Sequence, residues 1–398
     1  MPRFDTLDSI DWANLHHAYG EASDIPAHLR NLTDPDQAVR LKALGALGNS
    51  IAHPCGVYPA SLAVIPFLLE LVADPDQSDR GDILEIVRFI AQGQSWHDSH
   101  QTLLQLAGID NAEVAEQREQ ELTVVTQIKQ TFQGYLAFFV SLLNESDELV
   151  FQEALALLKR LTPTETAIQQ VIETSSTHNQ LVVRADCLVL LSRWNCTEAL
   201  SIAQQLFTKA TDDLLKLTSA MVIVSETLPA PIPLSINNYL VDVIEQHDPR
   251  LIMQYESLVL TGGFWLDLAC WLLEVESTVR DTCAPYFVQA IEQHPYERHL
   301  KAALLVVFGT RKVDHDHILT PLQRQVVAII ADTAYCKVGM DVPLLNLLDS
   351  FGLPSSIPVL DAYLGYPNAQ HPGLEVVSKQ ADAEYRARHR QKSLNKSN

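Results

Sequence analysis

Histidines and carboxylates gather in two short runs that could carry chemistry. Residues 96–100 place His97 and His100 on either side of an aspartate, and residues 314–317 alternate aspartate with histidine. Neighbours two apart point in different directions on a helix, so only a loop could gather the second run around a metal ion. The alternatives are a polar loop with a capping side chain for the first run and a solvated turn for the second. We therefore predict no metal site and no cofactor.

A loop over residues 51–59 holds further candidates. His53 and Tyr58 lie in it, and their side chains either hydrogen-bond the loop backbone or contact a partner. Aromatic side chains anchor interfaces better than other types do. We predict a protein-binding site formed by the following residues: His53, Tyr58, Trp96 and His97.

Common catalytic signatures are absent from the sequence. It contains no Gly-x-x-x-x-Gly-Lys phosphate loop, no Gly-x-Gly-x-x-Gly, no Gly-x-Ser-x-Gly and no His-Glu-x-x-His. We therefore assign no catalytic residue.

The elements that must position these residues follow a repeat. Asp-Pro-Asp-Gln occupies residues 34–37 and returns at 74–77, a shift of 40 residues (74 − 34), and Arg80 follows Arg40 by the same shift. Pro35 suits the first turn of a helix, and Val39, Ala43 and Leu47 then recur at helical spacing. Self-similarity near 40 residues, with two helices in each unit, is typical of solenoids.

These residues resemble HEAT repeats. In that family the turn aspartate and an arginine early in the second helix brace neighbouring repeats. The resemblance assigns this structural role to the following residues: Asp34, Arg40, Asp74, Arg80, Arg184 and Arg280. It also implies the fold, an all-α, HEAT-like α-solenoid that is a superhelix of antiparallel helix pairs.

Residues near both ends of the chain indicate a more specific group among HEAT-repeat proteins. Trp12, His16 and residues 63–68, together with residues 319–324 and 352–354, are similar to bacterial HEAT-repeat proteins of unassigned function.

Prolines at positions 229, 231 and 233 interrupt the helical pattern most clearly. Because alternate prolines force extended backbone, we predict an N-terminal HEAT-like half over 1–228 and a helical-repeat half over 229–365, continuous with the first. Residues 366–398 are predicted to form a linker and a charged tail.

The charge is acidic and uneven. The net charge is −21, and residues 379–398 hold six Lys/Arg against two Asp/Glu, which leaves −25 (22 − 47) for the rest. Such an excess repels nucleic acid and anionic membrane. The basic tail could touch nucleic acid, but it is expected to stay solvated or to fold back onto the body. Six dispersed cysteines and an N-terminus without an apolar signal core favour the cytoplasm.

Three classes of function can be compared. The favoured one is a protein-binding scaffold for a basic partner, and an immunity or antitoxin-type protein is its sharper form. The alternative is a HEAT-like enzyme, such as a phycobilin-lyase-like protein that acts on a small ligand. A HEAT-like nucleic-acid glycosylase is disfavoured by the net charge. The sequence leaves the oligomeric state open.

Overall fold

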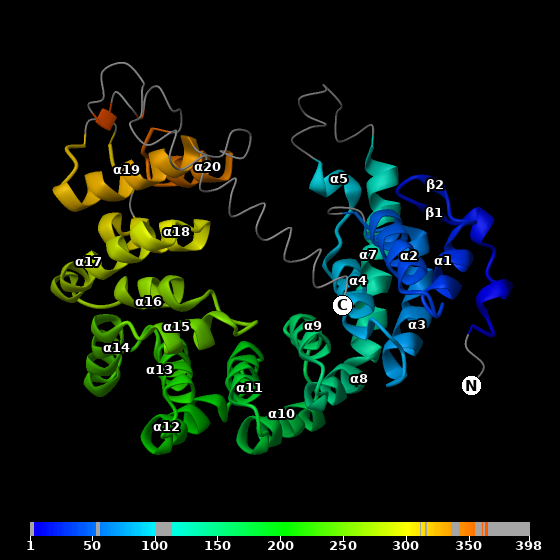
Figure 1. Ribbon diagram of the computed structural model, residues 1–398, viewed down its shortest axis with the longest axis horizontal. Helices are drawn as coiled ribbons and strands as arrows, with labels where there is room; N and C mark the ends of the chain where they lie inside the picture. The colour runs from blue at the N-terminus through cyan, green and yellow to red at the C-terminus, as the bar shows by residue number, and fades with distance from the viewer. Residues whose placement is uncertain are drawn as a thin grey trace. The chain divides into compact units, whose positions relative to one another are not determined.

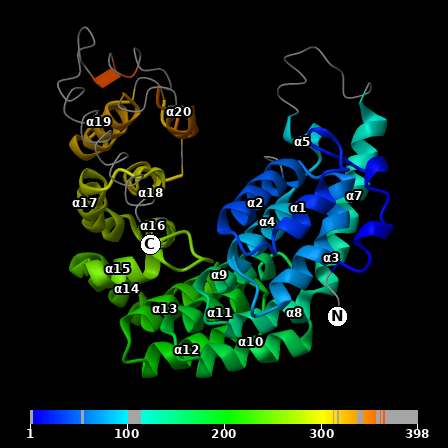
Figure 2. The same ribbon diagram turned by 45° about the vertical axis from the view of Figure 1, so that its right-hand side comes forward.

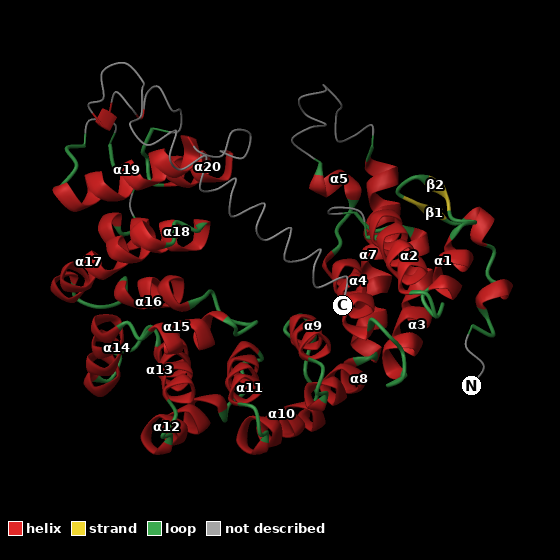
Figure 3. Cartoon of the chain, viewed as in Figure 1, coloured by secondary structure: helices red, strands yellow, loops and turns green. Residues whose placement is uncertain are grey.

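The computed structural model describes the following residues: 4–52, 56–100, 114–310, 312–314, 317–335, 342–354, 360, 363 and 364. Over these residues the chain is helical, which confirms the all-α part of the prediction (Figure 3). The strands found there, β1 (His16–His17) and β2 (Gly20–Glu21), form one short antiparallel pair. In the same part of the chain no helix is long and apolar enough to span a bilayer.

The first of two compact units comprises Met1–Ile202. Its 3-10 helices are η1 (Leu7–Ser9), η2 (Trp12–Asn14) and η3 (Leu142–Asn144). Its α-helices, labelled in Figures 1 and 2, are α1 (Ile25–Asn31), α2 (Gln37–Ile51), α3 (Pro59–Ala73), α4 (Arg80–Gln92), α5 (Trp96–Ser99), α7 (Ala115–Gly134), α8 (Leu136–Ser141), α9 (Glu148–Leu158), α10 (Glu165–Thr177), α11 (Leu181–Arg193) and the start of α12 (Ala199–Lys209). Neighbouring helices pack in pairs, with α1 on α2, α3 on α4, and α10 on α11.

The second unit comprises Ala203–Asn398. Its helices are α13 (Asp213–Thr227), α14 (Leu234–Gln246), α15 (Pro249–Glu256), α16 (Phe264–Leu272), α17 (Ser277–Gln293), α18 (Glu297–Phe308), α19 (Pro321–Tyr335) and α20 (Val342–Ser350). The division therefore falls inside α12, whereas the sequence places it at residue 228. The proline segment ends a helix without ending the packing, because α13 contacts both α14 and α15 beyond it.

Acidic and hydroxyl side chains begin many of the helices. The side chains of Asp36, Asp147, Thr164, Asp212 and Asp248 accept backbone N–H groups in the first turns of α2, α9, α10, α13 and α15. These N–H groups have no partner within their own helix, so a capping oxygen there stabilises the start of the helix.

Arginines predicted to brace the repeats share one kind of contact. Arg80 Nε donates to the Val72 carbonyl at 2.8 Å, and Arg184 Nε donates to the Ser175 carbonyl at 3.0 Å. Both carbonyls lie in the last turn of the preceding helix, where the backbone oxygens lack helical partners. Arg40 Nη1 likewise donates to the Asp34 carbonyl, at 3.0 Å. Arg280 differs, because its Nε is buried without a hydrogen-bond partner.

The turn aspartates act locally. Asp34 Oδ1 accepts the N–H of Asp36 at 2.8 Å, and Asp74 Oδ1 accepts that of Asp76 at 2.9 Å. The carboxylate that pairs with Arg40 is Asp79, at 2.6 Å from Nε, in the turn before α4. Asp79 adopts a left-handed backbone conformation, with φ of 58°.

Two ion pairs hold α4 against the α9 region. Arg80 forms a two-pronged pair with Glu145, at 3.0 and 3.2 Å, and Arg88 pairs with Glu153. Eight residues separate the arginines (88 − 80) and eight separate the glutamates (153 − 145). Gly81 allows close packing here, because an added Cβ would lie 2.6 Å from the Leu149 side chain. The chain therefore packs α9 directly against α4, although α5, α7 and α8 lie between these two helices in the sequence.

Replacing Arg40 with Ala is expected to lower the free energy of unfolding by about 3 kcal/mol, because Asp79 stays largely buried without its cation. Urea denaturation measures this loss. The control is Arg30→Ala, which removes a more exposed pair with Asp8 and should change stability by less than about 1 kcal/mol. An Arg40→Ala protein as stable as the parent would contradict the bracing role.

Candidate functional site

A groove of about 680 Å³ runs between α2 and α4 in the first unit. The two helices run in the same direction, because Arg40 pairs with Asp79 near their starts and Val57 N–H donates to the Gln94 carbonyl beyond their ends. The groove is lined by Leu41, Leu44, Gly45, Gly48, Asn49, Ala52, Gly56, Asp82, Glu85, Ile86, Phe89, Gln92, Gly93 and Gln94.

Two glycines on α2 lie in this groove. Gly45 and Gly48 are one turn apart in a regular helix, and a Cβ added at either would meet no atom within 4 Å. Each glycine lowers helix stability by about 0.8–1 kcal/mol relative to alanine. At Gly81 the nearby Leu149 side chain explains why the position holds glycine. No neighbour within the described chain gives such a reason at Gly45 or Gly48.

Apolar side chains border the glycines. Leu41 is 39% exposed and Phe89 is 44% exposed, although both are large and hydrophobic. The Arg88 guanidinium lies 4.3 Å from the centre of the Phe89 ring and holds it in a cation–π contact. Asp82 and Glu85 add two carboxylates, and the lining residues include no lysine or arginine, although Arg88 lies 3.3 Å from Glu85. The groove thus combines an apolar floor with negative charge.

The predicted binding residues Tyr58 and Trp96 lie beside Gly56, at one end of the groove. A Cβ on Gly56 would be 3.1 Å from the Tyr58 hydroxyl and 3.7 Å from Trp96 Cδ1. The Ser61 hydroxyl fastens this end, because it accepts the Tyr58 N–H at 2.9 Å and donates to the Ile51 carbonyl at 2.5 Å. Burial, with a further contribution from the Glu121 carboxylate, raises the pKa of the Tyr58 phenol.

His97 is buried and fastens α5 to α7. Its Nδ1 lies 2.9 Å from Glu121 Oε1, and Glu121 Oε2 accepts both the Ser95 hydroxyl and the His97 N–H. Trp96 stacks on the His100 ring at 4.5 Å. The structure therefore brings Tyr58, Trp96 and His97 to one region, where they support the end of the groove. His53 lies outside the described residues.

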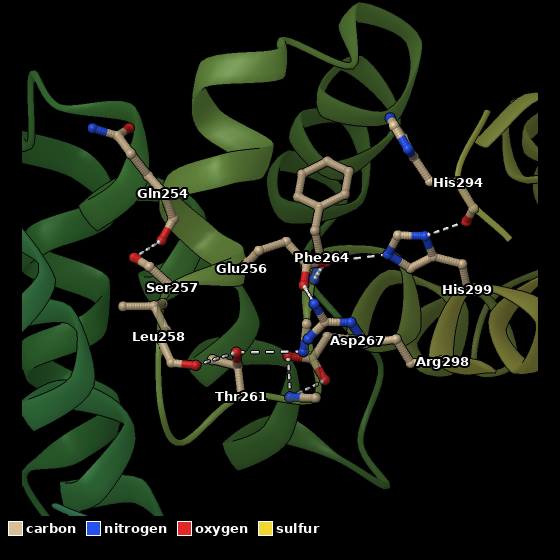
Figure 4. Close-up of polar contacts among 12 residues, drawn as sticks. Gln254, Glu256, Ser257, Leu258, Thr261, Phe264, Asp267, His294, Arg298 and His299 are labelled. Atoms are coloured by element: carbon tan, nitrogen blue, oxygen red, sulfur yellow. Dashed lines mark hydrogen bonds and ion pairs between the residues drawn. The ribbon is translucent and has the colours of Figure 1, made fainter. Parts of the chain in front are cut away.

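A second polar cluster, in the second unit, surrounds Glu256 at the end of α15 (Figure 4). Glu256 Oε1 accepts the Phe264 N–H at the start of α16, at 2.9 Å. Arg298 Nη2 is 2.7 Å from Glu256 Oε2, an ion pair without hydrogen-bond geometry, and His299 Nε2 is 3.7 Å from Oε1. His299 Nδ1 lies 2.9 Å from the His294 carbonyl.

Asp267 supports the loop between α15 and α16. Its carboxylate accepts the Gly262 N–H at 3.1 Å and the Tyr255 hydroxyl at 2.9 Å. Gly263 has φ of 95°, a conformation that favours glycine. The cluster holds a turn and a helix start together, although Glu256 Oε2 and His299 Nε2 are buried without a hydrogen-bond partner.

Sequence reasoning missed the groove and the Glu256 cluster for different reasons. Gly45 and Gly48 are visible in the sequence, but only packing shows that their surroundings are open. Glu256 and His299 are 43 residues apart (299 − 256), and no short motif joins them.

His315 and Asp316 lie outside the described residues, while His317 Nε2 contacts Gln323 at 3.2 Å. Within the described chain no group of three His, Cys, Asp or Glu is arranged as a metal site.

Comparison with known proteins adds little to this geometry. The sequence matches no protein-family model and no curated protein. Among solved structures, an engineered protein determined by crystallography aligns with 86% of this chain and 98% of its own, at 13% identity and a TM-score of 0.30.

The Glu256→Gln substitution should destabilise the protein in a pH-dependent way. Burial raises the pKa of this carboxyl, but the neighbouring His299 and Arg298 and the Phe264 N–H outweigh burial and bring it below its ordinary 4.5. A lowered carboxyl pKa contributes stability above the unfolded value, and that contribution is lost as pH falls through the folded value. The difference in melting temperature between parent and variant should therefore be full at pH 7 and should shrink below pH 4.5.

Glu173→Gln, on an exposed position of α10, is the control and should show no such trend. A Glu256→Gln effect that is equally large at pH 7 and in acid would contradict the assignment.

Proposed function

We propose that this protein is a protein-binding, HEAT-like α-solenoid scaffold whose α2–α4 groove docks a basic partner. The observation that carries the proposal is the pair of glycines, Gly45 and Gly48, in an open helix face. They weaken α2 without any packing benefit within the described chain, so close approach of another molecule is the simplest reason for them.

The surroundings of the glycines support a protein as the docked molecule. Leu41 and Phe89 expose apolar area next to them, and aromatic side chains in hollows are frequent centres of binding energy. The repeated arginine contacts at Arg40, Arg80 and Arg184 support the HEAT-like assignment, because each secures an inter-helix turn. Helical repeats of this kind present long surfaces that suit proteins.

The charge supports a basic partner. Asp82 and Glu85 lie in the groove, and the whole chain carries −21. Complementary charge accelerates encounter and selects partners more than it sets affinity. Toxins that cut nucleic acid need basic surfaces, so an immunity protein in the cytoplasm is the specific form of this proposal that the charge favours.

Capture of a tagged protein's partner from the source cell, followed by binding kinetics, tests the proposal. Phe89→Ala should raise the dissociation rate at least about tenfold, which corresponds to about 1.4 kcal/mol, because the ring supplies exposed apolar area in the groove. Association should slow as salt rises, since screening shortens the reach of charge to about 8 Å at physiological ionic strength.

Tyr296→Ala is the matched control, because Tyr296 is an aromatic residue in the second unit with a similar exposure of 47%. It should leave both rates unchanged. An acidic partner, an association rate indifferent to salt, or equal effects of the two substitutions would refute the proposal.

A further inference from the structure

We infer that the α2–α4 groove takes one α-helix of the partner, amphipathic and basic, laid along α2 over Gly45 and Gly48. This inference rests on the proposed function, and it specifies the form of the molecule that docks. Three features of the groove carry it: the backbone of its floor, its length and the placement of its charges.

The floor favours an incoming helix over an extended segment. The backbone groups of α2 around Gly45 and Gly48 are already paired within that helix, so the floor offers no hydrogen bonds to another backbone. The side-chain amides that line the groove, those of Asn49, Gln92 and Gln94, all belong to its C-terminal half. An extended segment would leave most of its N–H and C=O groups unpaired there, whereas a helix pairs its own.

Gly45 and Gly48 determine how closely the partner helix can approach α2. Axes of packed helices are about 8–10 Å apart, and the distance depends on the side chains at the contact. Glycine at two positions one turn apart allows the short end of that range. Leu41 lies one turn before Gly45 on the same face, and Phe89 lies across the groove on α4, so apolar side chains flank the approach.

The length of the groove fits about three helical turns. From Leu41 to Ala52, the residue that caps the end of α2, the lining face spans 11 residue steps (52 − 41), which is about 16 Å at 1.5 Å per residue. A partner helix of that length presents an apolar stripe at i, i+3, i+4 and i+7, the pattern used when helices dock into grooves.

The charges select a basic helix. Asp82 and Glu85 are one turn apart on α4 and both line the groove. Arg88 does not line the groove; its guanidinium pairs with Glu153, lies 3.3 Å from Glu85 Oε1 and covers the Phe89 ring. Lysines or arginines that flank the apolar stripe of the incoming helix would therefore meet the Asp82 carboxylate and the half-exposed Glu85 carboxylate, which Arg88 neutralises in part.

Binding of two synthetic peptides to the full chain tests the inference. The probe is an 18-residue peptide of leucine and lysine with leucine at i, i+3, i+4 and i+7, and its partner has the same composition in an order that spreads leucine around the helix. Fluorescence anisotropy measures affinity, and circular dichroism measures the helix content of the bound peptide. The amphipathic peptide should bind at least tenfold more tightly and become helical.

The second part of the experiment uses a variant whose new side chain fills the groove. Gly48→Leu should weaken binding of the amphipathic peptide at least tenfold without unfolding α2, because the added side chain enters open space and leucine favours the helix more than glycine does. Gly134→Leu is the matched control, since Gly134 also faces open space but does not line the groove. It should leave the affinity unchanged.

The outcomes separate this inference from the proposed function. Equal affinity for the two peptides, no detectable binding, or an unchanged affinity of Gly48→Leu would overturn the helical occupant. If Phe89→Ala still weakens the natural partner in that case, the groove remains a docking surface for a different kind of segment. If neither groove substitution affects the natural partner, the proposed function is overturned as well.

Discussion

The structure depends on arginine side chains that satisfy backbone carbonyls where one helix ends and the next begins. A helix leaves its last carbonyl oxygens without partners, and a tight turn between packed helices keeps water from supplying them easily. At Arg80 the guanidinium reaches the Val72 carbonyl and also binds Glu145. One side chain therefore fixes a turn and joins two segments 65 residues apart (145 − 80). Because guanidinium presents several donors in a rigid plane, lysine would not make the same set of contacts.

The helical class of the elements could be predicted from sequence because it depends on local signals. The Asp-Pro-Asp-Gln turn at 34–37 leads directly into α2, which begins at Gln37 with Asp36 as its cap and with Pro35 outside the helix. The matching turn at 74–77 ends before α4, which begins only at Arg80. The partner of Arg40 could not be predicted in the same way. The repeat indicated a turn aspartate, but Asp34 caps its own turn, and Asp79 takes the role from a left-handed conformation.

The candidate groove illustrates a different limit. Tyr58 and Trp96 stand out in the sequence as aromatic residues in irregular segments, and the structure places both at one end of the groove. The groove itself depends on what is missing around Gly45 and Gly48, and periodicity does not report empty space. A sequence shows residue types, whereas a docking surface is defined by the distances between faces of separate helices. The Glu256 cluster is similar, because His299 reaches that carboxylate only through the packing of α18 beside α16.

The glycines of α2 also determine how rigid one wall of the groove is. Two glycines on consecutive turns increase the backbone freedom of α2 when this helix unfolds locally. The amide protons of α2 should therefore exchange with solvent more readily than those of α4. A molecule that binds only to the folded helix adds to the stability of that helix by mass action. Hydrogen exchange in α2 thus becomes a direct reporter of whether the groove is occupied, and it requires no knowledge of the occupant.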